Sequence, residues 1–179
     1  DSSTMMNKVF EVIEAKNIFN ISYKSISILI HPKSYIHAIL KFNNGMIKIV
    51  AHDTTMQIPI FNTLYDQTNK KNKSFEIDLE KLNNLKLDNV DFKRYPLVKI
   101  INKLPNNNSL YETVVVSAND ELVNLFLNKK IRYTDINKII IEFINKKEFL
   151  KLKKITPRNI SQIEKLNKYV RFKINNMGI

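Results

Sequence analysis

The first eleven residues combine four polar side chains that can bind ions: Ser2, Asn7, Lys8 and Glu11. Hydroxyl residues followed by an apolar-periodic segment to about Phe19 predict a helix that begins here. The amide groups and dipole of a helix start, together with hydroxyls and a lysine, suit a phosphate. One turn later, the carboxylate of Glu11 could bind a hard cation beside that phosphate. The same pattern is also typical of an N-capped surface helix with solvated charges, so spacing alone leaves both interpretations open.

The expected helix has two faces when it is wound at about 100° per residue. Its apolar face collects Met5, Met6, Val9, Phe10, Val12 and Ile13. Asn7, Glu11 and Glu14 lie on the other face, with Lys8 at its edge. Lys16 falls inside the apolar arc and is the exception to the pattern. The face that carries the ion-binding groups is therefore expected to be exposed.

Beyond this helix, the residues that could do chemistry are His31, His37 and Met56. A lone histidine is more often a hydrogen-bonded structural residue than a catalytic one. Met56 is equally compatible with a contact in the hydrophobic core and with a contact to a cofactor. The residue types alone do not decide between these roles.

The run Asp1-Ser-Ser-Thr-Met-Met-Asn-Lys-Val-Phe-Glu11 resembles the segment of 1-deoxy-D-xylulose 5-phosphate reductoisomerases that binds substrate phosphate and metal. Further matches follow in the same order: Ile30-His-Pro-Lys-Ser-Tyr-Ile-His37, Met56-Gln-Ile-Pro-Ile60, Arg94-Tyr-Pro96 and Ile131-Arg-Tyr-Thr-Asp-Ile136. Together they span most of the chain. The resemblance implies an enzyme of non-mevalonate isoprenoid biosynthesis that makes 2-C-methyl-D-erythritol 4-phosphate, with NADPH and Mg²⁺ or Mn²⁺ as cofactors.

The resemblance also implies roles for individual residues. Glu11 would be one carboxylate ligand of the metal, and Ser2, Asn7, Lys8 and Glu11 would contact substrate. His37 would lie at the substrate site as the candidate catalytic residue, and Met56 would contact the nicotinamide cofactor. In this family, the NADPH-binding domain and the other metal carboxylates precede the matched segment. We therefore expect a partial chain that is inactive alone, with that N-terminal domain as its partner and with a homodimer as the assembly.

Several positions depart from the family pattern. The family loop Gly-x-Pro-Asp-Met-Arg is changed by His52, Thr54, Thr55 and Gln57, and losing glycine and proline changes the backbone angles that the loop can adopt. Asn119 is kept in a segment where neighbouring residues differ. These changes motivate an alternative, a degenerate paralogue with a binding or regulatory role.

The pattern of the chain predicts an α+β fold. The resemblance implies that residues 1–66 form the second half of an α/β catalytic domain, and the pattern predicts a small sheet of three strands between residues 26 and 51 that includes a hairpin at Asn43-Asn-Gly45. The polar stretch 67–92 is expected to be a linker, and residues 93–179 a C-terminal four-helix bundle. The expected helices span about 94–104, 112–128, 134–148 and 157–174.

Composition restricts the function classes. There is no cysteine, which excludes disulfides and thiolate chemistry. The net charge of +12 attracts anions, but the lysines are scattered and no nucleic-acid-binding motif is present, so we expect no nucleic-acid partner. Charge alone still leaves a basic nucleic-acid-binding module as a further alternative. No apolar run reaches the roughly 18 residues of a membrane span, so we expect a cytoplasmic protein, or one of a plastid-type organelle in a eukaryote.

Overall fold

The computed structural model describes residues 1–65 and 76–178. The chain divides into two compact units, and each is described by itself. The helical unit comprises Asp1–Ile28 and Asp91–Ile179, and the hairpin unit comprises Leu29–Val90.

These units are divided differently from the expected domains, because the first helix packs with the C-terminal helices. The expected linker 67–92 falls partly outside the described residues, and its described part contains a short helix and a short strand. The functional assignment of residues 1–66 to catalysis stays a prediction.

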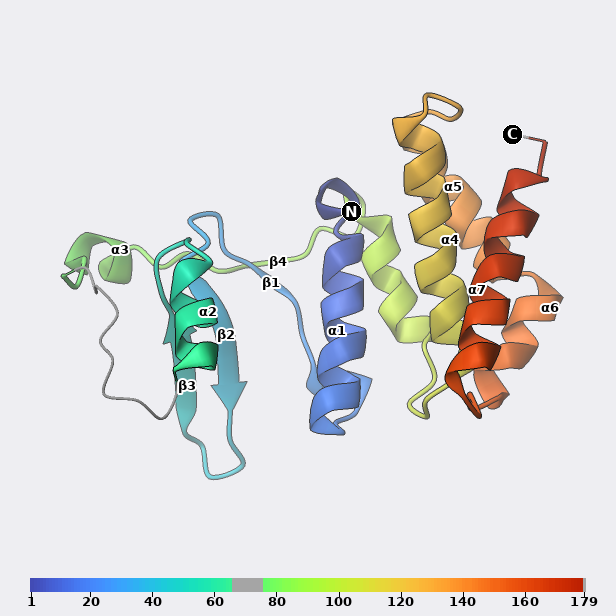
Figure 1. Cartoon of the computed structure of the whole chain (residues 1–179). Coiled ribbons are helices and arrows are strands. Elements are labelled where there is room, and N and C mark those ends of the chain that lie inside the picture. The colour runs from blue at the N-terminus through green and yellow to red at the C-terminus, as the bar shows by residue number, and fades with distance from the viewer. Residues whose placement is uncertain (66–75, 179) are drawn as a thin grey trace. The chain divides into compact units, whose positions relative to one another are not determined.

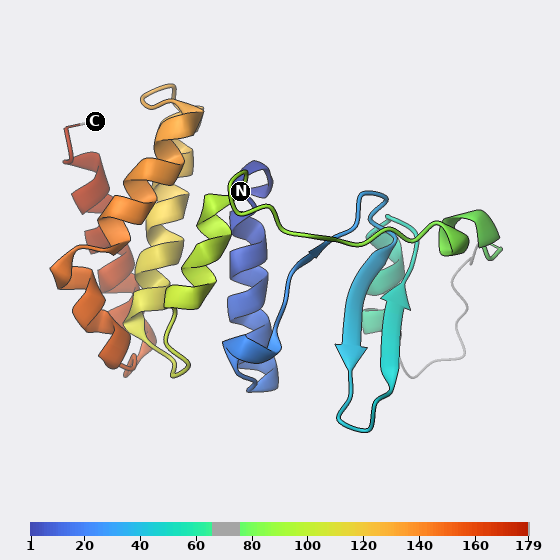
Figure 2. The same ribbon diagram turned by 180° about the vertical axis from the view of Figure 1, so that it is seen from behind.

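The helical unit consists of helices and 3₁₀ turns in its described part (Figures 1 and 2). In chain order these are η1 (Ser2–Thr4), α1 (Met6–Phe19), η2 (Tyr23–Ser25), η3 (Pro96–Lys103), α4 (Leu110–Leu127), α5 (Tyr133–Ile144), α6 (Lys147–Leu150), η4 (Lys151–Lys154) and α7 (Ile160–Asn175). The four expected C-terminal helical segments are therefore found. The first is a 3₁₀ helix rather than an α-helix, and it buries Leu97, Val98 and Ile100.

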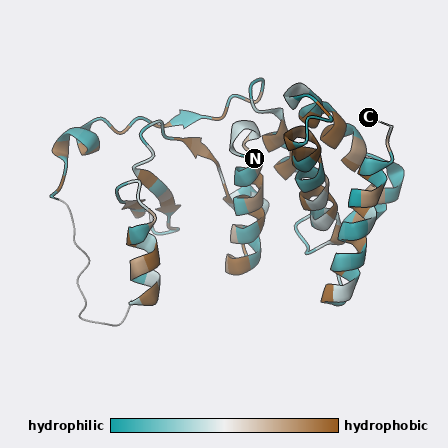
Figure 3. Cartoon of the chain, turned by 45° about the horizontal axis from the view of Figure 1, so that its top comes forward, coloured by the Kyte–Doolittle hydropathy of each residue, from teal (hydrophilic) through white to brown (hydrophobic). Residues whose placement is uncertain are grey.

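One hydrophobic core holds the helical unit together. It draws Met6 and Val9 from α1, Leu97 from η3, and many residues from α4, α5 and α7. Side chains of α4 such as Val114 and Leu122 have no exposed surface, so α4 is the central helix of this core. Figure 3 shows polar and apolar residues alternating around the helices, as expected when one side of each is buried.

The hairpin unit contains β1 (Leu29–Ile30), β2 (Ile36–Lys41), β3 (Ile47–Ala51), α2 (Gln57–Leu64), α3 (Leu79–Asn83) and β4 (Asp88–Asn89). β2 and β3 pair as an antiparallel hairpin, as predicted, and Gly45 in its turn has a φ of +86°. This positive φ explains the glycine, since other residues rarely adopt it.

The expected three-stranded sheet is wrong. β1 does not join β2 and β3 but pairs antiparallel with β4, a strand inside the expected linker. Ile26 and Ile28, expected in the first strand, are instead partly buried against the core of the helical unit. The isoleucines at positions 26 and 28 therefore alternate because they pack against the helical core, not because they form a strand. The α+β class itself is confirmed.

Candidate functional site

The first expected site residues lie at the start of α1, which is built differently from an ordinary N-cap. Residues Ser2–Thr4 form one 3₁₀ turn, and Met5 then adopts a left-handed conformation with a φ of +57° before α1 begins at Met6. The N-cap position is therefore held by Met5 and not by a hydroxyl residue. The Thr4 hydroxyl still accepts a hydrogen bond from the Met6 N–H, at 3.4 Å.

The amide groups at this helix start are less free than the sequence pattern predicted. The Met6 N–H donates to the Asp1 carbonyl at 3.0 Å, and the Lys8 N–H donates to the Met5 carbonyl at 3.1 Å. An anion bound here would therefore depend mainly on side chains. Ser2 is exposed, and Asn7 and Lys8 are half-buried, so all three are accessible from solvent.

Lys8 and Glu11 face each other on the polar side of α1. The Lys8 Nζ lies 2.8 Å from both carboxylate oxygens of Glu11. The side chains of Lys8 and Glu11 are 42% and 55% exposed, so water competes with this ion pair and the pair is weak. The structure thus places an ammonium and a carboxylate next to each other on the exposed side of α1, and their expected roles toward phosphate and metal stay predictions.

The opposite face of α1 anchors these groups. Met6 and Val9 are fully buried, and Val12 is 5% exposed, in agreement with the predicted apolar face. Lys16, the exception in that face, is also buried, and its ammonium donates to Asn108 and to Asn17. These amides compensate for the buried charge, which explains how a lysine fits on the apolar side.

Glu11 suits a single position in a metal site. Its exposed carboxylate is the ligand type that Mg²⁺ prefers. Within residues 1–65 and 76–178, however, no group of three or more His, Asp or Glu side chains could hold a metal ion together. The role of Glu11 as a single metal ligand stays a prediction.

In the hairpin unit, His37 stacks on His52. The ring centroids are 3.6 Å apart with an interplanar angle of 10°. The His37 Nε2–H donates to the His52 carbonyl at 3.1 Å, and the His52 Nδ1–H donates to the Asp53 carbonyl at 2.6 Å. This leaves Nδ1 of neutral His37 as an acceptor. His31 instead donates from Nδ1 to the Lys86 carbonyl at 2.7 Å, a structural contact that fixes the backbone beside β1.

The loop that follows β3 lines a cavity of about 670 Å³. The cavity is bordered by Tyr35, Asp53, Thr54, Thr55, Gln57, Glu76, Asp78 and Lys81. Met56, the expected cofactor contact, is 67% exposed at the start of α2 and lies between two of the lining residues. Its exposure excludes a core role within the hairpin unit and leaves its side chain accessible to a ligand.

Sequence reasoning missed Lys81 because it lies in a polar stretch that resembles a linker. Its ammonium bonds Asp53 at 3.0 Å and lies 3.5 Å from Asp78. The hydrogen bond to Asp53 raises the pKa of Lys81, and the bond from the Lys81 N–H lowers the pKa of Asp78. No local pattern pointed to this pair, because Asp53 and Lys81 are 28 residues apart.

Comparison with known proteins identifies the family of this chain. The family described as the DXP reductoisomerase C-terminal domain matches residues 53–173. The 1-deoxy-D-xylulose 5-phosphate reductoisomerase of Pelagibacter ubique (strain HTCC1062) is 58% identical over all 179 residues of this chain and over 46% of its own length. The chain belongs to the 1-deoxy-D-xylulose 5-phosphate reductoisomerase family.

Other reductoisomerases extend the comparison. The relative from Sulfurihydrogenibium sp. (strain YO3AOP1) is 36% identical over 85% of the chain and 40% of that protein. The solved structure of the Zymomonas mobilis reductoisomerase with NADPH matches with a TM-score of 0.82 and 27% identity, over 98% of this chain and 45% of that one. A reductoisomerase structure with NADPH, fosmidomycin and magnesium matches with a TM-score of 0.86 and 26% identity, over 98% and 44%.

The chain spans about half the length of the reductoisomerases that it matches. The shared part includes both the start of α1 and the loop after β3. None of the helices in the described part of the chain is long and apolar enough to span a membrane.

Proposed function

We propose that this chain provides the phosphate-binding groups and one metal ligand of a reductoisomerase that converts 1-deoxy-D-xylulose 5-phosphate to 2-C-methyl-D-erythritol 4-phosphate. The names of its relatives support the reaction. The single observation that carries the assignment is the pair of Lys8 and Glu11, 2.8 Å apart on the exposed face of a helix whose other face is buried.

In this proposal, the substrate phosphate is held by the Ser2 hydroxyl, the Asn7 amide and the Lys8 ammonium. Charge-assisted hydrogen bonds from these groups fix one end of the substrate and orient its carbon skeleton. Binding would draw Lys8 toward the phosphate and free the Glu11 carboxylate. Because the ion pair that joins them is weak and exposed, this exchange costs little free energy.

Glu11 would be one ligand of Mg²⁺ or Mn²⁺, a choice supported by magnesium in the solved structures of reductoisomerases. The bound ion supplies Lewis-acid polarisation of the substrate oxygens. The role of Glu11 is to hold one coordination position beside the phosphate groups. The ordered, buried side of α1 keeps that position fixed.

His37 and Met56 would act from the hairpin unit. His37, with Nε2–H bonded to the His52 carbonyl, would offer Nδ1 to a substrate hydroxyl as a hydrogen-bond acceptor. Met56 would make an apolar contact to the nicotinamide of NADPH, which supplies the hydride when bound. NADPH in the structures of reductoisomerases supports this cofactor.

The test uses a full-length enzyme in which this chain is completed by the remaining part of the Pelagibacter ubique relative. Glu11→Gln should keep the fold, because the side chain is exposed, but should lose most metal-dependent turnover. Glu14→Gln, a change at another exposed position of the same helix, is the matched control and should keep activity. Turnover by the Glu11→Gln enzyme at the level of the control would remove Glu11 from the metal site.

Lys8→Ala should mainly raise KM, because a phosphate contact made in both ground and transition state is uniform binding. A large fall in kcat with KM unchanged would contradict that role. The 179 residues alone are expected to show no NADPH-dependent turnover, and the complete enzyme is expected to be a homodimer.

A degenerate paralogue remains the second candidate. The changed loop after β3 favours it, since Asp53 is paired with Lys81 and His52 is stacked on His37. A completed, folded protein that binds NADPH but does not turn over substrate would support this candidate. Turnover at the rate of the Pelagibacter ubique enzyme would exclude it.

A further inference from the structure

The turn that carries Ser2 is held in place by side chains from distant helices. Residues Asp1, Ser2 and Ser3 are exposed, and only Thr4 of this segment is buried. The residue that follows, Met5, has a left-handed backbone, which a non-glycine residue keeps only when its surroundings enforce it. The geometry of this turn therefore needs support from elsewhere in the helical unit.

Two hydrogen bonds from the bundle provide such support. The Asn119 Nδ2 of α4 donates to the Asp1 Oδ1 at 2.7 Å. The Tyr133 hydroxyl of α5 donates to the Ser3 carbonyl at 2.8 Å. These bonds are made to the residues on either side of Ser2. They connect groups that are 118 and 130 residues apart in the sequence.

Asp1 connects this support to the rest of the site. Its carbonyl accepts hydrogen bonds from the Met6 N–H at 3.0 Å and from the Thr4 hydroxyl at 3.0 Å. A shift of Asp1 would therefore move both the turn with Ser2 and the first turn of α1, where Asn7 and Lys8 lie. The bond from Asn119 acts at the point where these two parts meet.

Asn119 is an unusual residue for a helix core. Its side chain has no exposed surface, and its Oδ1 has no hydrogen-bond partner within the described residues. A buried amide with an unpaired oxygen costs free energy, so its other hydrogen bond needs a structural reason. The bond to Asp1 is the contact that explains an amide here. Tyr133, by contrast, is 41% exposed, so water can replace its bond more easily.

We infer that Asn119 is a positioning residue for substrate phosphate, with Tyr133 as a weaker second support. This inference rests on the proposed function of Ser2, Asn7 and Lys8. Asn119 touches no substrate in this scheme. It acts through Asp1, by fixing the turn and the helix start that present the three phosphate-binding side chains.

The experiment compares two substrates in the completed enzyme: 1-deoxy-D-xylulose 5-phosphate and 1-deoxy-D-xylulose, which lacks the phosphate. Asn119→Ala should raise KM for the phosphorylated substrate about tenfold, as expected for loss of a hydrogen bond to a charged group. It should leave kcat/KM for the unphosphorylated sugar nearly unchanged. An equal loss with both substrates would overturn the inference, since a general structural defect does not distinguish them.

Ser117→Ala is the matched control. Ser117 lies on the same helix, is fully buried, and accepts a hydrogen bond from Asn167 of α7 at 2.8 Å. It should keep KM for both substrates. Asp1→Ala should reproduce the effect of Asn119→Ala. Asp1→Asn should retain KM, because its amide oxygen can still accept the hydrogen bond. The double variant Asp1→Ala with Asn119→Ala should have a KM for the phosphorylated substrate no higher than that of either single variant. Full additivity would contradict an action through Asp1.

A separate measurement keeps this inference distinct from the proposed reaction. Inorganic phosphate can be titrated into the completed protein with carbon-labelled methionine methyl groups, of which Met5 lies beside the turn. The Met5 signal should shift in the unsubstituted protein and shift much less in Asn119→Ala. If turnover is absent but this difference is seen, the proposed reaction fails and the positioning role stands. Equal shifts in both proteins would refute the positioning role, whatever the activity.

Discussion

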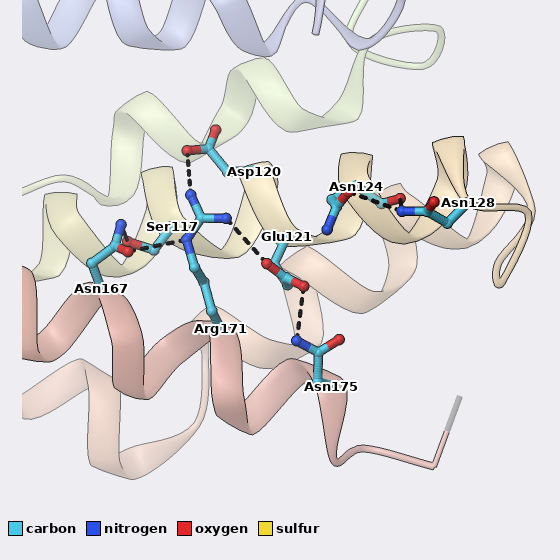
Figure 4. A network of polar contacts seen from close by, with 8 residues as sticks. All are labelled: Ser117, Asp120, Glu121, Asn124, Asn128, Asn167, Arg171 and Asn175. Atoms are coloured by element: carbon cyan, nitrogen blue, oxygen red, sulfur yellow. Dashed lines mark hydrogen bonds and ion pairs between the residues drawn. The ribbon is translucent and has the colours of Figure 1, made fainter.

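Arg171 ties the last helix to the central helix of the core, and replacing it should destabilise the helical unit. Its Nη2 donates to Asp120 and its Nη1 to Glu121, each at 3.1 Å, while Nε donates to Asn167 at 3.0 Å (Figure 4). Glu121 also accepts from Asn175 at 2.8 Å. The two carboxylates differ in burial: the side chain of Glu121 is 8% exposed and that of Asp120 is 38% exposed.

The size of the effect follows from this difference. Arg171→Met keeps most of the apolar stem that packs on α4 but removes all three bonds. Breaking a buried ion pair costs about 3–5 kcal/mol, because the remaining charge stays buried. The guanidinium is 36% exposed, so water can partly solvate Glu121 once it is gone. We therefore expect the free energy of unfolding to fall by about 2–3 kcal/mol.

The assay is urea unfolding of the 179-residue chain, followed by far-UV circular dichroism and by tyrosine fluorescence, with coincident transitions as the check on two-state behaviour. Asp120→Asn is the matched control and should cost less than about 1 kcal/mol, because its ion pair is exposed. Arg171→Met combined with Glu121→Met should recover most of the loss, since it leaves no buried charge without a partner. Asn175 is exposed and can then bond to water.

Two outcomes would refute this reasoning. One is equal destabilisation by Arg171→Met and Asp120→Asn, which would mean that burial of Glu121 is irrelevant. The other is a double variant that is no more stable than Arg171→Met alone, which would assign the loss to packing of the arginine stem rather than to the buried carboxylate.

Two further changes test the fold. Tyr111 is fully buried, and burial raises its pKa to about 12, above the value near 10 in an unfolded chain. The folded state then keeps a proton that the unfolded state releases, so the free energy of unfolding should fall by about 2–3 kcal/mol as the pH rises from about 10 to about 12. In urea unfolding, Tyr111→Phe should reduce the fall of this free energy with pH. An unchanged fall would contradict the role of Tyr111. Gly45→Ala should weaken the β2–β3 hairpin by about 1 kcal/mol, because φ is +86° and no atom lies within 4 Å of an added Cβ. Amide exchange in β2 and β3 should be faster in Gly45→Ala than in the unsubstituted protein, with a smaller increase in Gly45→Asn, if the effect comes from the backbone conformation. Equal exchange in the unsubstituted protein and both variants would contradict this origin.

The helices could be predicted because their signals are local. The apolar periodicity of α1 predicted its extent to Phe19, and its polar face predicted that Lys8 and Glu11 would be accessible. The turn residues at Asn43–Gly45 predicted the β2–β3 hairpin. In each case, neighbours within a few residues determine the outcome, and the sequence contains those neighbours in order.

The contacts that could not be predicted join residues far apart in the chain. Nothing near Asn119 indicates a bond to Asp1, and nothing near Lys81 indicates a bond to Asp53. The pairing of β1 with β4 likewise joins segments about 60 residues apart, and its strands have only two residues each. Such pairings depend on the whole fold, so the short strands had no pattern long enough to be recognised. The start of α1 was misjudged for a different reason: a left-handed Met5 is set by its surroundings rather than by its own preference.

The two groups of proposed site residues have different physical support. Ser2, Asn7, Lys8 and Glu11 belong to a unit with a continuous hydrophobic core, and α1 contributes to that core directly. His37 and Met56 belong to the hairpin unit, where Val90 is the only buried residue of the described part and apolar side chains such as Ile47 and Ile49 are exposed. A two-stranded hairpin without a packed face is only marginally stable. The groups proposed to bind phosphate and metal can therefore hold their geometry within the helical unit, whereas the hairpin unit gives His37 and Met56 little packed core to fix their positions.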